Sequence, residues 1–192
     1  MVNFFFGLGF GSGLTLVGLS LASLWRPGLQ FWPPPAPASW QARYFWWAFR
    51  LLLLGLVVVS VLDFRGAGPA GSWTYWLGVP LALLGIGLAF AITFQLGWRD
   101  AHGEAQGLKT GGWYRFSRNP IYVVTLVGLL GVGLVVHSVY AYLLLFLWAA
   151  LYLVAPFLEE PWLEAQYGEA YRQYKARVPR FIGWPKAARP PA

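Results

Sequence analysis

A long stretch without charge constrains this chain more than any other feature. Residues 119–158, a run of 40 positions, contain no Asp, Glu, Lys or Arg. As one helix this run would be about 60 Å long, twice the hydrocarbon core of about 30 Å of a bilayer. His137 and Ser138 fall at its midpoint. The sequence therefore predicts a helical hairpin of two spans, from about Pro120 to Val136 and from about Val139 to Leu158. His137 is expected at a tight interfacial turn rather than in a buried functional site.

Composition extends this interpretation to the whole chain. Hydrophobic residues make up 58% and charged residues 11%, whereas soluble domains are about 25% charged. Lipid must therefore cover much of the surface. Apolar runs near residues 1–25, 44–62 and 73–96 predict three more spans. We expect an all-α integral membrane protein with about five transmembrane helices in one continuous membrane domain. Residues 1–100 hold the first three spans, and residues 101–192 hold a polar loop, the hairpin and a C-terminal amphipathic helix.

The first predicted span holds glycines at alternate positions. Gly7, Gly9, Gly11 and Gly13 give overlapping small-xxx-small spacings, which allow helices to approach closely. A nucleotide-binding loop is the weaker interpretation, because no strand precedes these glycines. The stretch also lacks a basic segment and an obvious small-residue cleavage site, so we interpret it as a retained helix and not as a signal peptide.

The placement of the basic residues predicts the orientation in the membrane. Five spans put the first loop, the third loop and the C-terminal segment on one side, and these carry most of the Lys and Arg residues. Arg65 falls opposite, and Arg50 lies inside the second span, from which it can snorkel to the interface. The positive-inside rule then places the N-terminus outside and the C-terminus in the cytoplasm. We expect the bilayer as a partner and no nucleic acid, since the net charge of +7 comes from residues that flank apolar spans.

Two residue types that often carry chemistry are scarce. Cysteine is absent, which excludes a disulfide framework, a thiolate nucleophile and a Cys-ligated metal. His102 and His137 are the two histidines. We therefore expect no metal site.

The first of two polar and aromatic segments precedes the hairpin, from Gln106 to Tyr122. Ser117 or Asn119 is expected to cap the helix that follows, with Pro120 at its first position. Free N–H groups at this helix start, together with Arg118, suit a carboxylate or a phosphate. An ordinary helix cap with one interfacial arginine explains the same residues equally well.

The second polar segment, from Leu158 to Pro179, follows the hairpin on the same side of the membrane, so the two segments can meet. Glu159 and Glu160 are expected at the end of a membrane helix, where carboxylates oppose the helix dipole and lose water. This placement favours a cationic partner, and pairing with nearby arginines or exposure to water is the alternative. Residues 162–177 are expected to form an amphipathic helix, either lying on the membrane or acting as a lid over a ligand. Its apolar face comprises Leu163, Tyr167, Tyr171 and Tyr174.

One kind of small molecule suits both segments, namely a zwitterion with a carboxylate, an ammonium, a ribose and an aromatic base, such as S-adenosylmethionine. Residues 112–122, GWYRFSRNPIY, resemble the G-x-Y-x-x-x-R-[HN]-P-x-Y motif of the isoprenylcysteine carboxyl methyltransferase family, which is related to the phospholipid N-methyltransferases. Residues 159–163, EEPWL, resemble its E-E-x-x-L motif. Residues 168–179 match the G-x-x-Y-x-x-Y-x-x-x-V-P that follows.

The resemblance implies a methyltransferase of a bacterial inner membrane that uses S-adenosylmethionine from the cytosol and releases S-adenosylhomocysteine. It implies cofactor-binding positions at Gln106, Leu108, Tyr114, Asn119, Pro120, Tyr122 and Glu159, with Glu160 in support. Arg118, Tyr171 and Tyr174 are the candidate catalytic residues, and the two tyrosines are expected to line the pocket. Asn119 stands where the eukaryotic members of the family have histidine.

One departure from the resemblance bears on the methyl acceptor. The isoprenylcysteine enzymes have an arginine one turn before the paired glutamates, which is used to hold the substrate carboxylate, and here that position is Ala155. We expect a lipophilic or membrane-associated acceptor that is methylated on a carboxylate, an amine or a thiol. Two other functional classes stay open. One is a membrane reductase of the sterol-reductase type that uses NADPH, and the other is a non-enzymatic transport or assembly protein.

Overall fold

The computed structural model describes residues 1–64, 73–96 and 107–184, and all regular structure within these ranges is helical. The helices are α1 (Val2–Trp25), α2 (Trp40–Leu62), α3 (Trp73–Leu96), α5 (Pro120–Val136) and α6 (Val139–Arg177), with short 3-10 turns η1 (Pro27–Leu29) and η2 (Gly112–Arg115). The predicted bounds of the third and fourth spans agree with α3 and α5. The second span begins earlier than predicted, because the Ser39 side chain caps α2 by accepting a hydrogen bond from the Ala42 N–H at 3.2 Å.

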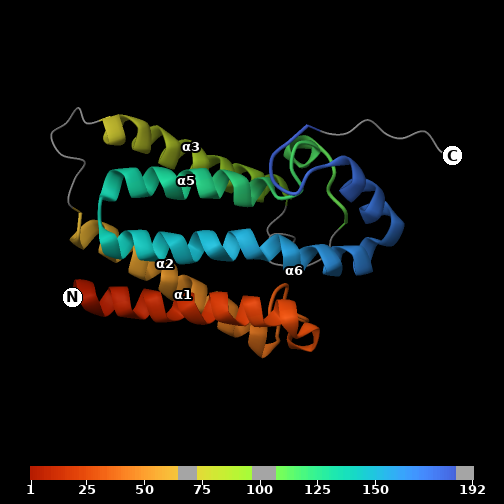
Figure 1. The fold of residues 1–192 in the computed structure, drawn as a ribbon, viewed down its shortest axis with the longest axis horizontal. Coiled ribbons are helices and arrows are strands. Elements are labelled where there is room, and N and C mark those ends of the chain that lie inside the picture. Colours follow the sequence, from red (N-terminus) through yellow and green to blue (C-terminus); the bar gives the residue numbers. More distant parts are fainter. Residues whose placement is uncertain (65–72, 97–106, 185–192) are drawn as a thin grey trace.

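The long helices run side by side along the longest axis of the molecule (Figure 1). α1 packs on α2 and α3 packs on α5, while α6 lies between the two pairs. Four of these helices are long and apolar enough to cross a membrane, and α5 is shorter at 17 residues. That length corresponds to about 26 Å, close to the thickness of a hydrocarbon core. The chain is an all-α integral membrane protein, as predicted.

Glycines bring the helix pairs together, although only some of the predicted ones do so. Gly9 of α1 packs against Gly55 of α2, where an added Cβ would lie 3.2 Å from the Gly55 Cα. Gly7 and Gly11 have nothing within 4 Å of an added Cβ, so their predicted role in packing is wrong. The reason is the helical period, which turns residues two positions apart to different faces. The tightest approaches lie between α3 and α5: an added Cβ at Gly131 would meet the Ala82 backbone N at 2.2 Å, and one at Gly85 would meet the Gly128 backbone N at 2.3 Å.

Gly85→Ala is expected to destabilise the protein by about 1–3 kcal/mol, because the new methyl group meets backbone atoms of α5 that cannot rotate away. Thermal unfolding of the purified protein in a mild detergent measures this loss. Gly87→Ala is the matched control on the same helix, since nothing lies within 4 Å of a Cβ there. That variant is expected to unfold at the wild-type temperature or above it, because alanine favours a helix. Equal melting temperatures for the two variants would contradict the tight α3–α5 crossing.

The end of the bundle that holds the α5–α6 turn is fixed by Ser138, which is fully buried. His137 ends α5 with a φ of 53°, in the left-handed region. Ser138 then caps α6 by accepting a hydrogen bond from the Ala141 N–H at 3.2 Å, and its hydroxyl donates to Asp63 Oδ2 at 2.7 Å. The predicted tight turn at His137 is confirmed, and the contact with Asp63 ties the turn to the end of α2.

At the opposite end, α6 continues well past the predicted end of its span at Leu158. The helix runs through Glu159 and Glu160 to a break at Gly168 (φ 53°, ψ −127°) and then resumes to Arg177. The change from apolar to charged residues therefore marks where α6 leaves the lipid, not where the helix ends. The two glutamates lie inside a helix, so the expected clash with the dipole of a helix C-terminus does not arise. The predicted separate helix over residues 162–177 is wrong in its start, because the first part of that stretch belongs to the long helix.

Candidate active site

A cavity of about 550 Å³ lies between α2, α3, α5 and α6, and the loop before η2 closes one side of it. Most of the predicted site residues lie along its wall. These are Leu108, Tyr114, Arg118, Asn119, Tyr122, Glu159, Tyr171 and Tyr174. Pro120 is buried at the start of α5, behind the wall, and Gln106 lies outside the described residues. The two motif segments do meet in space, at the end of the hairpin where α5 begins and α6 leaves the bundle (Figure 1).

Glu159 is held by donors from both halves of the chain. Its Oε1 accepts a hydrogen bond from the Trp32 indole N–H at 2.6 Å and a second from the Tyr122 hydroxyl. The Trp32 ring is buried and stacks on Phe45 of α2 at 4.2 Å between centroids. Both hydrogen bonds go to Oε1, so Oε2 is left to accept from a ligand. The orientation of this carboxylate is therefore fixed before any ligand arrives.

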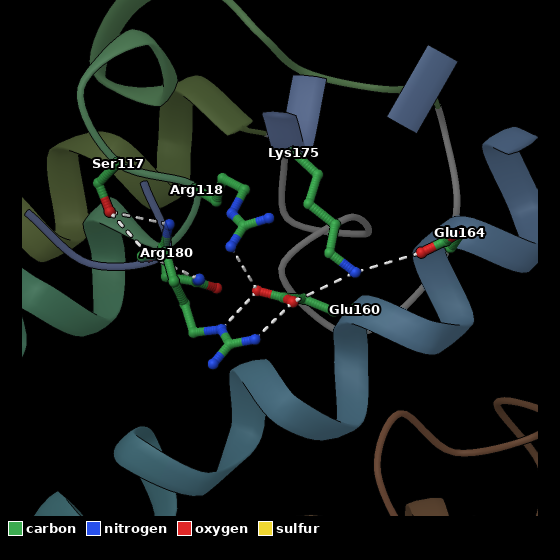
Figure 2. Close-up of polar contacts among 7 residues, drawn as sticks. Ser117, Arg118, Glu160, Glu164, Lys175 and Arg180 are labelled. Atoms are coloured by element: carbon green, nitrogen blue, oxygen red, sulfur yellow. Dashed lines mark hydrogen bonds and ion pairs between the residues drawn. The ribbon is translucent and has the colours of Figure 1, made fainter. Parts of the chain in front are cut away.

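Glu160 is not among the residues that line the cavity, and its side chain lies in a cluster of basic side chains (Figure 2). Arg180 donates to it twice, from Nε to Oε1 at 2.6 Å and from Nη2 to Oε2 at 2.8 Å. Nη2 of Arg118 lies 3.0 Å from Oε1, and Lys175 Nζ lies 3.9 Å from Oε2. The hydrogen bond to Glu160 raises the pKa of the Arg180 guanidinium. Glu160, which is 4% exposed, therefore holds arginines of the protein itself.

Arg118 joins the basic cluster to the cavity. Its side chain is 8% exposed and pairs with Glu160 through Nη2 alone. Its Nε and Nη1 atoms are buried and have no hydrogen-bond partner within the described residues. A buried guanidinium with unmet donors is costly unless a ligand supplies acceptors. Since Arg118 lines the cavity, its free donors suit a ligand carboxylate or phosphate.

The start of α5 differs from the predicted cap. Asn119 occupies the N-cap position, but its side chain does not cap the helix; the Ser117 hydroxyl oxygen accepts from the Asn119 backbone N–H at 3.0 Å. The Asn119 side-chain amide instead donates to the carbonyl of Arg180 at 2.9 Å, and the Ser117 hydroxyl donates to the same oxygen at 3.3 Å. The Arg118 backbone N–H donates to the Pro179 carbonyl at 3.0 Å. The polar side chains of this turn therefore also hold the segment after α6, and the Asn119 side chain does not accept from the N–H groups at the positive end of the α5 dipole.

The stretch after the Gly168 break covers the cavity. Tyr171 and Tyr174 are buried there, and the Tyr174 hydroxyl donates to the Tyr114 carbonyl at 2.8 Å. Before the break, the Tyr167 hydroxyl accepts from the Gly107 N–H at 3.1 Å. The predicted apolar face thus packs on the loop before η2 and lines the cavity, and its role as a lid over a ligand stays a prediction. Burial raises the pKa of the Tyr171 and Tyr174 hydroxyls, so both phenols are neutral near pH 7.

The cavity residues from the N-terminal half were not among the predicted site residues, and Trp32 and Arg50 are the two that bear most on the chemistry. Trp32 holds Glu159 from the loop between α1 and α2, and Arg50 lines the cavity from α2. Neither Trp32 nor Arg50 lies in a recognisable sequence motif. Arg50 was visible as a charged residue inside a span, which is a signal for function. Trp32 gave no signal, since a tryptophan in a proline-rich loop has no periodic pattern.

Comparison with known proteins agrees with this geometry. No curated protein and no solved structure matches the chain. The family model described as phospholipid methyltransferase matches residues 73–170, half of the chain, from the start of α3 to just past the Gly168 break. The matched stretch includes Arg118 and both glutamates, and it leaves α1 and α2 outside. This chain therefore belongs to the phospholipid methyltransferase family of membrane proteins.

Proposed function

We propose that this protein transfers a methyl group from S-adenosylmethionine to a lipophilic acceptor at the cytoplasmic face of a membrane. One observation carries the proposal: a buried arginine with unmet donors and a buried carboxylate of fixed orientation line the same cavity. Arg118 supplies the first and Glu159 the second. Membership of a methyltransferase family supports the same reaction class.

The chemistry of these groups fits the cofactor. The free Nε and Nη1 atoms of Arg118, next to the start of α5, would hold the carboxylate of S-adenosylmethionine. The Oε2 atom of Glu159 would accept from its ammonium group. Aromatic rings suit both a sulfonium cation and an adenine base. Those in the wall of the cavity are Tyr114, Tyr122, Trp162, Tyr171 and Tyr174. A volume of about 550 Å³ also lies within the range of about 300–1,000 Å³ that is typical of small-molecule sites.

When bound, S-adenosylmethionine would supply a sulfonium methyl group: an acceptor nucleophile would bond to the methyl carbon in line with the breaking C–S bond, and S-adenosylhomocysteine would leave with the electron pair on its sulfur. The work left to the protein is to orient the two molecules and to exclude water. Tyr171 and Tyr174 line the cavity as neutral phenols and so do not serve as bases. Their part in the reaction is to close the cavity beside the reacting atoms. Arg118 and Glu159 fix the two charged ends of the amino-acid moiety.

Titration calorimetry with S-adenosylhomocysteine and with NADPH tests this function. The purified chain is expected to bind S-adenosylhomocysteine with one site and to give no heat with NADPH. Binding of NADPH alone would favour the reductase alternative, and no binding of either ligand would favour the non-enzymatic alternative. Transfer of a labelled methyl group to lipid extracts then identifies the acceptor.

The cytoplasmic location of the site is also part of the proposal. It rests on the basic residues that flank the site end of the bundle. S-adenosylmethionine does not cross a bilayer unaided, because it is charged. Labelled cofactor added to sealed vesicles is therefore expected to bind inverted vesicles from a bacterial inner membrane and not right-side-out vesicles. The opposite result would reverse the orientation without affecting the chemistry.

A further inference from the structure

The cavity extends from the two motif segments into the part of the bundle that lies within the membrane. Its wall there comes from the N-terminal half of the chain as well as from the hairpin. The apolar residues of this deeper part include Phe49 and Leu53 of α2, Ile86 and Phe90 of α3, and Leu151 of α6. Such a wall suits the hydrocarbon part of an amphiphile, because burial of apolar surface favours binding.

Arg50 is the charged residue of this deeper wall. It lies ten positions after Trp40, the first residue of α2, which corresponds to about 15 Å along the helix. The Arg50 side chain is exposed, and its guanidinium lies 5.9 Å from the centroid of the Trp47 ring, which is itself 65% exposed. No carboxylate of the described residues pairs with Arg50. A charged side chain inside a membrane span is costly unless it has a partner or a route to water, so an anion bound in the cavity would stabilise Arg50.

The described wall of the cavity offers Arg50 little negative charge. Ala155 lies one turn before Glu159 on α6 and lines the same cavity as Arg50. Its methyl side chain adds no charge to this wall. Glu159 is the one acid among the described residues of the wall, and Trp32 and Tyr122 already hold its Oε1. The guanidinium of Arg50 therefore has no carboxylate partner among the described residues.

We propose that Arg50 binds the negatively charged group of the methyl acceptor and so selects an anionic amphiphile, with a carboxylate or a phosphate next to a hydrocarbon chain. This assignment rests on the proposed function, because it treats the deeper part of the cavity as the acceptor end. An arginine suits either anion, since its planar fork can donate two parallel hydrogen bonds to two oxygens. Arg50 is a specificity residue from α2, outside the stretch that the family shares.

Binding of matched fluorescent amphiphiles tests the assignment without any turnover. The probes are 11-(dansylamino)undecanoic acid and the corresponding alcohol, added to the full-length protein in a neutral detergent. The wild-type protein is expected to bind the carboxylate at least about tenfold more tightly than the alcohol. Arg50→Gln is expected to abolish this preference by weakening only the carboxylate. Arg50→Lys is expected to keep part of it. Displacement by dodecanoic acid and by dodecyl phosphate distinguishes a carboxylate preference from a phosphate preference.

Arg43→Gln is the matched control, because Arg43 is exposed on the same helix and does not line the cavity. It is expected to keep the wild-type preference. Equal binding of the two probes by the wild-type protein, or an unchanged preference in Arg50→Gln, would overturn the assignment and leave Arg50 as a residue that snorkels to the interface. The affinity for S-adenosylhomocysteine is measured in parallel and is expected to be unchanged in Arg50→Gln. If the wild-type protein does not bind S-adenosylhomocysteine, the proposed function is rejected. The probe comparison still decides whether Arg50 selects anions.

Discussion

Glu159→Gln is expected to weaken the binding of S-adenosylhomocysteine by at least about tenfold and up to about 100-fold. The reason is that one charged hydrogen bond to the ligand ammonium contributes about 1.5–3 kcal/mol, and 1.4 kcal/mol corresponds to a tenfold change in Kd. Glutamine keeps an oxygen that can accept from the Trp32 indole and the Tyr122 hydroxyl, so the variant keeps the local fold. Titration calorimetry in detergent measures the Kd directly.

Two further variants show whether the effect of Glu159→Gln comes from the lost charge of Glu159 or from a change in the orientation of its side chain. Glu169→Gln removes a carboxylate from an exposed site that pairs with Arg172, and its Kd is expected to equal that of the wild type. Trp32→Phe keeps a ring to stack on Phe45 but loses the indole N–H that orients Glu159. Its affinity is expected to fall by only a few-fold, because the carboxylate retains its charge and its bond from Tyr122. An unchanged Kd in a folded Glu159→Gln variant would remove Glu159 from the cofactor site.

The helical hairpin was predictable because it depends on two lengths alone. A charge-free run of 40 residues is twice what a bilayer accommodates, so the chain must turn near its midpoint, and it does so at His137. The gathering of the two motif segments follows from the same argument, since a hairpin returns the chain to the side it left. These inferences needed no knowledge of side-chain packing.

The roles of the paired glutamates were not predictable from the same signals. Consecutive residues on a helix point about 100° apart, so Glu159 and Glu160 cannot both face one cavity once the helix continues through them. The sequence suggested that the helix ends at Leu158, so the different directions of the two side chains were not expected. Trp32 was hidden for another reason: its contact with Glu159 joins residues 127 positions apart, and no local pattern specifies such a pairing.

Glu160→Gln is expected to lower the melting temperature by about 6–12 °C. Glu160 is 4% exposed, and its charge faces Arg118 and Arg180, so the substitution leaves two guanidinium groups close together without their anion. Removing one partner from a buried pair costs about 3–5 kcal/mol, and we use about 3 kcal/mol because Arg180 is partly exposed. Each kcal/mol corresponds to about 2–4 °C for a chain of this size.

Glu164→Gln is the matched control for this loss of stability. Its carboxylate pairs with Lys175 at 3.3 Å on the surface, where an ion pair contributes about 0–1 kcal/mol. The control is expected to melt within about 4 °C of the wild type. A melting temperature for Glu160→Gln no lower than that of Glu164→Gln would contradict a structural role for the buried cluster.

A double-mutant cycle with Arg118→Met shows whether Glu160 acts through Arg118. Arg118 contacts Glu160 through Nη2 and lines the cavity, where its Nε and Nη1 atoms have no partner among the described residues. Glu160→Gln is therefore expected to weaken the binding of S-adenosylhomocysteine in the wild-type background, because it loosens the arginine that would meet the ligand carboxylate. In the Arg118→Met background the same substitution is expected to have little further effect on Kd. Additive effects of the two substitutions on Kd would mean that Glu160 does not position Arg118 for the ligand. Non-additive effects would instead mean that the two adjacent glutamates have different roles: Glu159 binds the ligand itself, and Glu160 positions Arg118, which binds the ligand.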